Sequence, residues 1–163
     1  MKKYIFYDTD STGHEQFDIT GVQYFLLLQA CFKYSFSFSI ILSPDFSGNI
    51  EKWEKYRIPV SDKVRDIYPH YATDSYGKSR AYEIRHYRLT PEMCDLIVRH
   101  TDSLFSWLCG WGFDNPDDPA FFREDGSAFF SSIIHEGECT LNLKDNEFLP
   151  DGLLDEKWIK ESS

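Results

Sequence analysis

The stretch of residues 113–143 constrains the fold most, because polar turns separate its apolar runs. Asp125-Gly126 is a typical hairpin dipeptide, since a tight turn between strands needs a positive φ that glycine adopts at no steric cost. The dipeptide separates two runs of strand composition, and a second polar break at residues 135–138 precedes a third run. The sequence therefore predicts a three-stranded antiparallel meander. Its strands comprise residues 120–122, 128–134 and 139–143.

The length of 163 residues favours one domain, residues 1–163, that buries enough surface to fold without cross-links. Fourteen Phe, ten Tyr and four Trp supply the core. We expect an α+β fold, a mainly antiparallel sheet whose C-terminal-half meander is packed by two main helices.

The first predicted helix covers residues 22–31, where apolar side chains recur at helical spacing on nearly all sides. Asp18 or Thr20 could cap it, and its composition predicts a helix buried all round. The second begins at Thr90-Pro91, with a capping hydroxyl followed by proline in the first turn. Its apolar face continues to Trp111, so we expect nearly five turns ending at one of two glycines. These are Gly110 and Gly112.

Outside the meander, residues 2–7 and 80–87 have strand composition. Strict alternation over residues 34–40 predicts a half-buried strand with Tyr34, Phe36, Phe38 and Ile40 on one face. Residues 45–79 show little periodicity, so we expect short elements there that the pattern does not locate. Near the C-terminus, the turn at residues 150–152 is followed by a predicted short helix over 153–160.

The net charge is −10, and it is concentrated late in the chain. Residues 113–163 hold four basic and thirteen acidic side chains. Such a field repels nucleic acid and anionic membrane surfaces, so we expect neither as a partner. A basic protein is the partner that this charge favours.

No signal-peptide pattern follows Lys2-Lys3, and no apolar run approaches the length of a membrane span, so we expect a cytoplasmic protein. The four cysteines are widely spaced in apolar surroundings. Reduced, buried thiols fit this spacing better than a disulfide framework or a zinc site. They are Cys31, Cys94, Cys109 and Cys139.

Two His-Glu pairs are the candidates for metal or acid–base chemistry, His14-Glu15 and His135-Glu136. Neither forms the His-Glu-x-x-His pattern that aligns two imidazoles on one metal. His135 is better explained as a strand-end residue that bonds the turn backbone. There is no nucleophile elbow and no glycine-rich phosphate loop, so we predict no catalytic residue, no metal and no cofactor.

Acidic side chains form a cluster in the sequence around the meander, and it has three interpretations. It could be a solvated face that keeps the protein soluble. Residues 114–118 could bind calcium, although the Asp-x-Asn-x-Asn-Gly spacing is absent. The third interpretation is an anionic surface that binds a basic partner, with aromatics such as Trp111 and Phe113 as anchors. The predicted partner-binding residues are Asp114, Asp117, Asp118, Phe121, Glu124, Asp125, Glu136 and Glu138.

Four runs carry a resemblance to a known group of proteins: Leu89-Thr90, residues 104–108, residues 116–127 and residues 132–136. Over roughly residues 85–143 the chain resembles small bacterial immunity-type proteins of polymorphic or contact-dependent toxin systems. The Asp-Gly turn followed by Ser-x-x-His-Glu is the most specific part. The resemblance implies a toxin inhibitor and assigns no catalytic residue.

The predicted function is therefore that of an immunity protein that neutralises a cognate toxin domain, such as a basic nuclease, through its acidic surface. One alternative is a small metal-dependent enzyme that uses His135 and Glu136. Another is a regulatory or phage-encoded protein that uses the same surface on a different partner. The sequence leaves the oligomeric state open.

Overall fold

A large antiparallel sheet forms the centre of the fold in this computed structural model, which describes residues 1–68 and 82–162. Within these residues the eight strands of the sheet follow the order β10-β1-β9-β8-β7-β2-β4-β3, and β5 pairs only with β6. The predicted single α+β domain is confirmed. The strands are β1 (Lys2–Tyr7), β2 (Ser37–Leu42), β3 (Arg57–Ile58), β4 (Glu83–Arg88), β5 (Cys109–Gly110), β6 (Phe113–Asp114), β7 (Asp117–Phe122), β8 (Ala128–Ile133), β9 (Glu138–Leu143) and β10 (Trp158–Lys160). The helices are α1 (Gly21–Tyr34), α2 (Asp62–Arg65) and α3 (Pro91–His100), with 3₁₀ turns η1 (Glu51–Tyr56) and η3 (Ile134–Glu136).

The predicted meander is confirmed, because β7, β8 and β9 are neighbours in the sheet. Phe121 pairs with Phe130, which pairs with Leu141. Gly126 adopts φ +79° at the β7–β8 turn, and its N–H donates to Arg123 O at 2.9 Å. The first strand begins three residues earlier than predicted, at Asp117.

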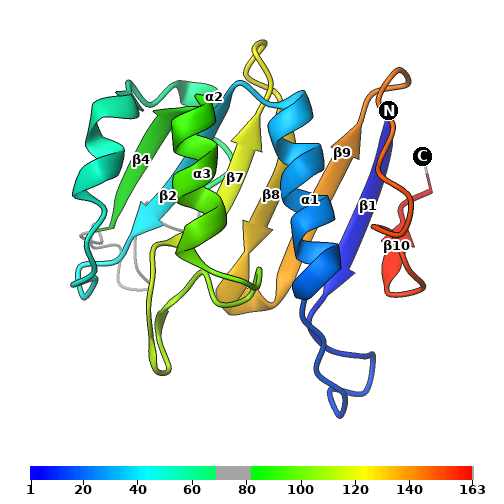
Figure 1. The fold of residues 1–163 in the computed structure, drawn as a ribbon. Coiled ribbons are helices and arrows are strands. Elements are labelled where there is room, and N and C mark those ends of the chain that lie inside the picture. Colours follow the sequence, from blue (N-terminus) through cyan, green and yellow to red (C-terminus); the bar gives the residue numbers. More distant parts are fainter. Residues whose placement is uncertain (69–81, 163) are drawn as a thin grey trace.

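Helices α1 and α3 lie side by side on one face of the sheet (Figure 1). Between helices and sheet lies the main core, where Phe38 packs edge-on against Trp107 at 5.8 Å and at an angle to Phe121 at 4.9 Å between ring centroids. Trp107 also donates its indole N–H to the Tyr24 hydroxyl at 2.9 Å. The hydrogen bond satisfies the one polar atom of a tryptophan that is only 1% exposed.

The opposite face of the sheet carries a smaller core around Ile41 and Phe122, to which α2 contributes Val64. Tyr68 lies in this core, and its hydroxyl bonds to Ser39 at 2.9 Å. The predicted strand over residues 34–40 is confirmed for residues 37–40, which belong to β2, but the prediction that it is half-buried is wrong. All six residues of β2 are buried because β2 is central in the sheet and is covered on both faces.

Helix α1 is longer than predicted and less buried. It follows Thr20, whose side chain makes no capping hydrogen bond, and it extends to Tyr34, which was expected in a strand. Tyr24 and Leu28 face the core, whereas Val22 and Phe25 are 75% and 54% exposed. The prediction that this helix is buried on all sides is wrong, because it packs against the sheet along one side only.

Helix α3 begins as predicted, with the Thr90 hydroxyl accepting from Met93 N at 3.1 Å, but it ends at His100. The prediction of a continuous helix to Gly110 or Gly112 is wrong. The backbone N–H groups of Leu104 and Phe105 donate instead to residues 18–19. Hydroxyls in residues 101–106 bond to one another as well, which competes with a helical backbone.

The predicted helix over residues 153–160 is also wrong. Trp158 to Lys160 form β10, which pairs antiparallel with β1 at the edge of the sheet. The Trp158 ring packs 5.4 Å from that of Phe6, so a tertiary contact overrides the local preference. The turn at Pro150 is confirmed by a hydrogen bond from Leu153 N to Pro150 O.

The segment 45–79 contains short elements, namely η1, β3 and α2, as far as residue 68. The rest of that segment, with His70 and the first residues of the predicted strand 80–87, lies outside the described residues. Strand β4 confirms the later part of that strand. No helix in the described part of the chain is long and apolar enough to cross a membrane.

Candidate functional site

The predicted partner-binding residues do not form one continuous surface. Strand β7 has Asp117 and Asp118 at its start, whereas Glu124 and Asp125 follow its end in the β7–β8 turn. Six residues of strand span roughly 17 Å. Phe121 is 2% exposed and belongs to the core. The sheet therefore separates the acidic side chains that lie close together in the sequence.

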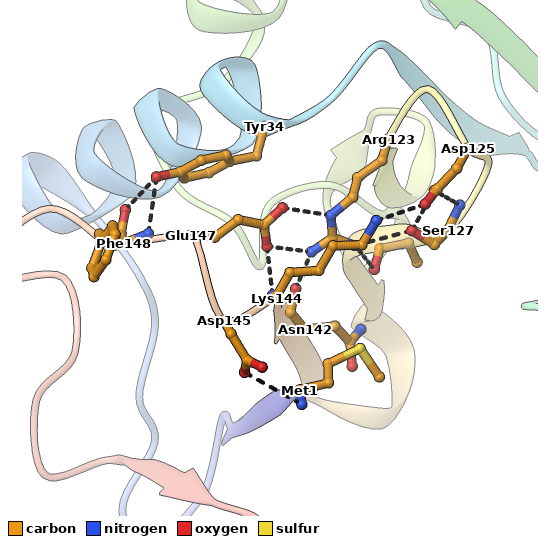
Figure 2. A network of polar contacts seen from close by, with 11 residues as sticks. Met1, Tyr34, Arg123, Asp125, Ser127, Asn142, Lys144, Asp145, Glu147 and Phe148 are labelled. Atoms are coloured by element: carbon orange, nitrogen blue, oxygen red, sulfur yellow. Dashed lines mark hydrogen bonds and ion pairs between the residues drawn. The ribbon is translucent and has the colours of Figure 1, made fainter.

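At the β7–β8 turn, Asp125 is held by intramolecular contacts (Figure 2). Its carboxylate accepts from Lys144 Nζ at 2.6 Å and from the Ser127 hydroxyl at 2.6 Å. These hydrogen bonds, with the positive charge of Lys144, hold the pKa of Asp125 well below its ordinary value. Glu124 beside it is also exposed.

Beneath this turn, Arg123 and Glu147 form a buried ion pair that Figure 2 shows at the centre of the network. Each side chain is 7% exposed. Arg123 Nη1 donates to the Ser127 hydroxyl and to Ala128 O, and its Nη2 donates to Asn142 O. The pair thus ties the segment after β9 to the β7–β8 hairpin.

At the other end of β7, Asp117 and Asp118 point into the protein. Asp117 Oδ1 accepts from Cys109 N at 2.8 Å, and Asp118 Oδ1 accepts from Ile134 N at 2.7 Å. Burial, together with the nearby charge of Asp118, raises the pKa of Asp117 to about 7. Asp118 adopts φ +49° and is 0% exposed. Both carboxylates stabilise backbone turns and are not presented on the surface.

His135 lies in η3, which follows β8, and its side chain is 42% exposed. Its Nδ1 is 3.9 Å from Asp118 Oδ2 and its Nε2 is 3.9 Å from Glu136 Oε1, both beyond hydrogen-bonding distance. Glu136 is exposed and Glu138 is partly exposed. The described residues contain no group of three His, Cys, Asp or Glu side chains that could hold a metal ion.

The three carboxylates of the calcium hypothesis are bound separately. Asp114 accepts from the Ser47 hydroxyl at 2.6 Å and from Ser47 N at 3.0 Å, while Asp117 and Asp118 bind the backbone groups given above. Among the cysteines, Cys31 and Cys139 are buried, as predicted, and burial raises the pKa of each thiol well above its ordinary value. Cys94 and Cys109 are partly exposed.

The β5–β6 hairpin is exposed, and it begins where the sequence wrongly predicted the last turn of a long helix. Trp111 at its tip is 85% exposed and adopts φ +50°, between Gly110 at +128° and Gly112 at +89°. Phe113 on the returning strand is 46% exposed. The sequence signal for this hairpin is the Gly-Trp-Gly tripeptide, since glycines on both sides permit the left-handed backbone that the turn requires.

The hairpin borders a cleft of about 450 Å³ against the two helices. Phe25 of α1 and Phe113 of the hairpin line it, with His100 at the end of α3 and Asp102 after that end. Burial lowers the pKa of His100, whose ring packs 4.9 Å from that of Trp107. Asn115 also lines the cleft, and its Nδ2 donates to Ser106 O at 2.7 Å.

The chain has been compared with protein-family models, with curated proteins and with solved structures. None of the three comparisons gives a match.

Proposed function

We propose that this protein is an immunity-type protein that binds a basic toxin domain and neutralises it by covering its active site. The resemblance over roughly residues 85–143 suggests the immunity role. The surface charge supports binding to a basic protein.

The observation that carries the proposal is the exposure of charges in residues 113–162. Eight acidic residues there are exposed, whereas Lys160 is the single exposed basic residue of that range. Of the other basic side chains, Arg123 is buried against Glu147, and Lys144 bonds to Asp125. The exposed acidic residues are Asp114, Glu124, Asp125, Glu136, Asp145, Asp151, Glu156 and Glu161.

An excess of exposed negative charge of this kind increases the rate of association with a cationic partner, and it disfavours partners of like charge. A nuclease domain must attract phosphate, so its active site is cationic. Covering such a site with carboxylates both binds the domain and excludes its substrate.

The experiment first identifies the genes that flank the gene of this chain. Any toxin-like product among them is then co-expressed with this chain, and the mixture is analysed by gel filtration. We expect survival of the cells and a stable complex whose affinity falls as salt rises. If the toxin stays lethal and no complex forms, the immunity role is wrong.

Two triple charge-reversal variants distinguish an effect of where the charges lie from an effect of net charge on association. Replacing Glu124, Asp151 and Glu156 by Lys should slow association at least about tenfold. The matched control replaces the exposed Glu15, Glu51 and Asp66 by Lys, which gives the same net charge. Equal effects of the two triple variants would show that location does not matter, and would contradict the proposed use of this surface.

A further inference from the structure

We propose that the exposed turn at Asp151-Gly152 is a site of spontaneous modification, where Asp151 isomerises to isoaspartate, and that the fold protects Asp125-Gly126 from the same reaction. Both Asp-Gly dipeptides lie in described turns, but they differ in the bonds that their reacting groups make. The inference concerns the chemistry of the chain itself and does not depend on the proposed function.

The reaction needs only the aspartate, the glycine after it and water. The glycine backbone nitrogen attacks Cγ of the neutral aspartate carboxyl, a C–N bond forms, and the carboxyl OH leaves as water with the proton of the nitrogen. Water then opens the succinimide ring at either carbonyl. Opening at one carbonyl restores aspartate, and opening at the other leaves the chain linked through Cγ with a free α-carboxylate, which is isoaspartate. One water is lost and one is regained, and glycine hinders the attack least because it has no Cβ.

At residues 151–152 both reacting groups are accessible. Asp151 and Gly152 are exposed. In the described part of the chain, no group donates to the Asp151 carboxylate and none accepts from the Gly152 N–H. A hydrogen bond from Leu153 N to Pro150 O at 3.3 Å closes the turn without using either group. A Cβ added at Gly152 would meet only Leu26 Cδ1, at 3.9 Å, so the glycine is open on that side.

At residues 125–126 the carboxylate is already engaged (Figure 2). It accepts from Lys144 Nζ at 2.6 Å, from the Ser127 hydroxyl at 2.6 Å and from Ser127 N at 2.8 Å. These bonds hold the pKa of Asp125 well below its ordinary value. The attack needs the neutral carboxyl, because an ionised carboxylate has no OH to lose as water. The contacts of Asp125 therefore keep it in its unreactive form.

The backbone of the same turn is held as well. Gly126 N, which would be the attacking atom, donates to Arg123 O at 2.9 Å. Lys63 of α2 donates to Asp125 O, and its side chain covers the glycine, since a Cβ at Gly126 would lie 2.8 Å from Lys63 Cδ. At least one charge-assisted hydrogen bond must break before the attack, so isomerisation should be at least about tenfold slower at Asp125 than at Asp151.

Isomerisation at Asp151 would lengthen the main chain directly before a core residue. Isoaspartate adds one carbon to the backbone path, and Leu153, which follows the turn, is 0% exposed and belongs to the main core. The α-carboxylate replaces the side-chain carboxylate, so the mass and the charge of the protein stay the same. The modification must therefore be detected through the linkage itself.

The test incubates the folded protein at neutral pH and body temperature and digests samples with trypsin over several weeks. The two dipeptides fall in separate tryptic peptides, residues 124–144 and residues 145–157. Reversed-phase chromatography separates the isomers, and electron-transfer fragmentation distinguishes the two linkages and locates the altered residue. We expect isoaspartate at residue 151 to accumulate at least about tenfold faster than at residue 125.

Two controls separate the effect of the fold from that of the dipeptide. In urea both dipeptides lie in an unfolded chain, so their rates should become similar. Asp151→Glu keeps the negative charge but would have to close a larger ring, so this variant should form no isomer of residues 145–157.

Equal rates in the folded protein, or a faster reaction at Asp125, would overturn the inference. So would the absence of isoaspartate at residue 151 over a period in which the chain in urea forms it. A preference for Asp151 that persists unchanged in urea would overturn it too, because local sequence and not the fold would then be the cause. An isomer of residues 145–157 that persists in Asp151→Glu would place the reaction at another aspartate.

Discussion

Arg123 and Glu147 form a bidentate ion pair, with Nε to Oε1 at 2.7 Å and Nη2 to Oε2 at 2.6 Å, in which both side chains are 93% removed from solvent. All five N–H donors of the guanidinium are used, because Ser127, Ala128 and Asn142 accept the remainder. Burial opposes ionisation of Glu147, yet the hydrogen bonds from Arg123 and from Lys144 N hold its pKa below the ordinary value. A pair with this many partners stabilises the loop after β9.

We predict that removing either partner alone destabilises the fold strongly. Arg123→Met and Glu147→Met should each lower the free energy of unfolding by about 3–5 kcal/mol, since a buried charge is left without its partner. Arg123→Met should cost more, because it also leaves the Ala128 and Asn142 carbonyls without this donor. The double variant should cost less than the sum. Urea denaturation measures these values.

The control for this set of variants is Glu161→Gln. Glu161 forms an exposed ion pair with Lys3, and the two side chains are 51% and 38% exposed, respectively. Exposed pairs contribute about 0–1 kcal/mol, so this variant should stay close to the unaltered protein. Additive effects of the two Met substitutions would mean that Arg123 and Glu147 act independently, contrary to the geometry.

Gly137 should tolerate no side chain, because its position combines a left-handed backbone with a close neighbour. Its φ is +69°, and a Cβ would lie 2.0 Å from Asp8 Oδ1. Asp8 N also donates to Gly137 O at 2.7 Å, so the two segments cannot separate without losing this hydrogen bond. We predict that Gly137→Ala lowers the free energy of unfolding by about 2–4 kcal/mol, measured by urea denaturation.

Gly13→Ala is the matched control, since Gly13 has φ +72° with open space around it. This substitution should cost about 1 kcal/mol, the backbone contribution alone. If both variants lost the same stability, the contact with Asp8 would contribute nothing.

The fold was predictable where the determinants are local. The Asp125-Gly126 turn and the Thr90 cap each act within a few residues, and both are found where the sequence places them. Trp107 shows the limit of this approach. It lies within the predicted helix from Thr90 to Trp111. It is buried, as its hydropathy indicates, but it is not helical, because the backbone at residues 104–105 bonds to residues 18–19.

The candidate site was less predictable, because proximity in the sequence is not proximity on a sheet. Asp118 and Asp125 are seven residues apart in the chain but lie at opposite ends of β7. The alternation of a strand says which face a side chain takes, but not which carboxylates a turn backbone will bind. The exposed position of Trp111 depends on where α3 ends, which nonlocal hydrogen bonds decide.

Asp117 should make the stability of the protein depend on pH. Burial raises its pKa from 3.8 to about 7, so the folded state favours the neutral carboxyl. Because the pKa is raised, the contribution of Asp117 to stability is fully present below the pKa of the unfolded state, near pH 4. This contribution is lost as the pH rises through about 7. Asp117→Asn keeps an oxygen that can accept from Cys109 N and removes the ionisation. The free energy of unfolding of the variant, relative to that of the unaltered protein, should rise by on the order of 2 kcal/mol from about pH 5 to about pH 8. Urea denaturation at each pH measures this difference.

Asp114→Asn is the control, because hydrogen bonds from Ser47 lower the pKa of Asp114. This carboxylate is ionised in both the folded and the unfolded state over that pH range. Its substitution should therefore change the free energy of unfolding by the same amount at about pH 5 and at about pH 8. A pH-independent difference for Asp117→Asn would mean that its carboxylate is ionised in the folded protein throughout.

Trp107 and Trp111 lie four residues apart, but truncation should destabilise the fold strongly only at Trp107. Trp107 is 1% exposed, packs against Phe38 and donates to the Tyr24 hydroxyl, so Trp107→Ala should lower the free energy of unfolding by about 3–5 kcal/mol. Trp111 is 85% exposed with φ +50°, so Trp111→Ala should change the stability by less than about 0.5 kcal/mol.

Acrylamide quenching of the unaltered protein should affect mainly one tryptophan, and the quenched fraction should disappear in Trp111→Ala. Strong destabilisation by Trp111→Ala would instead mean that the hairpin packs against the fold. A neutral effect would show that folding does not require the tryptophan side chain at this position.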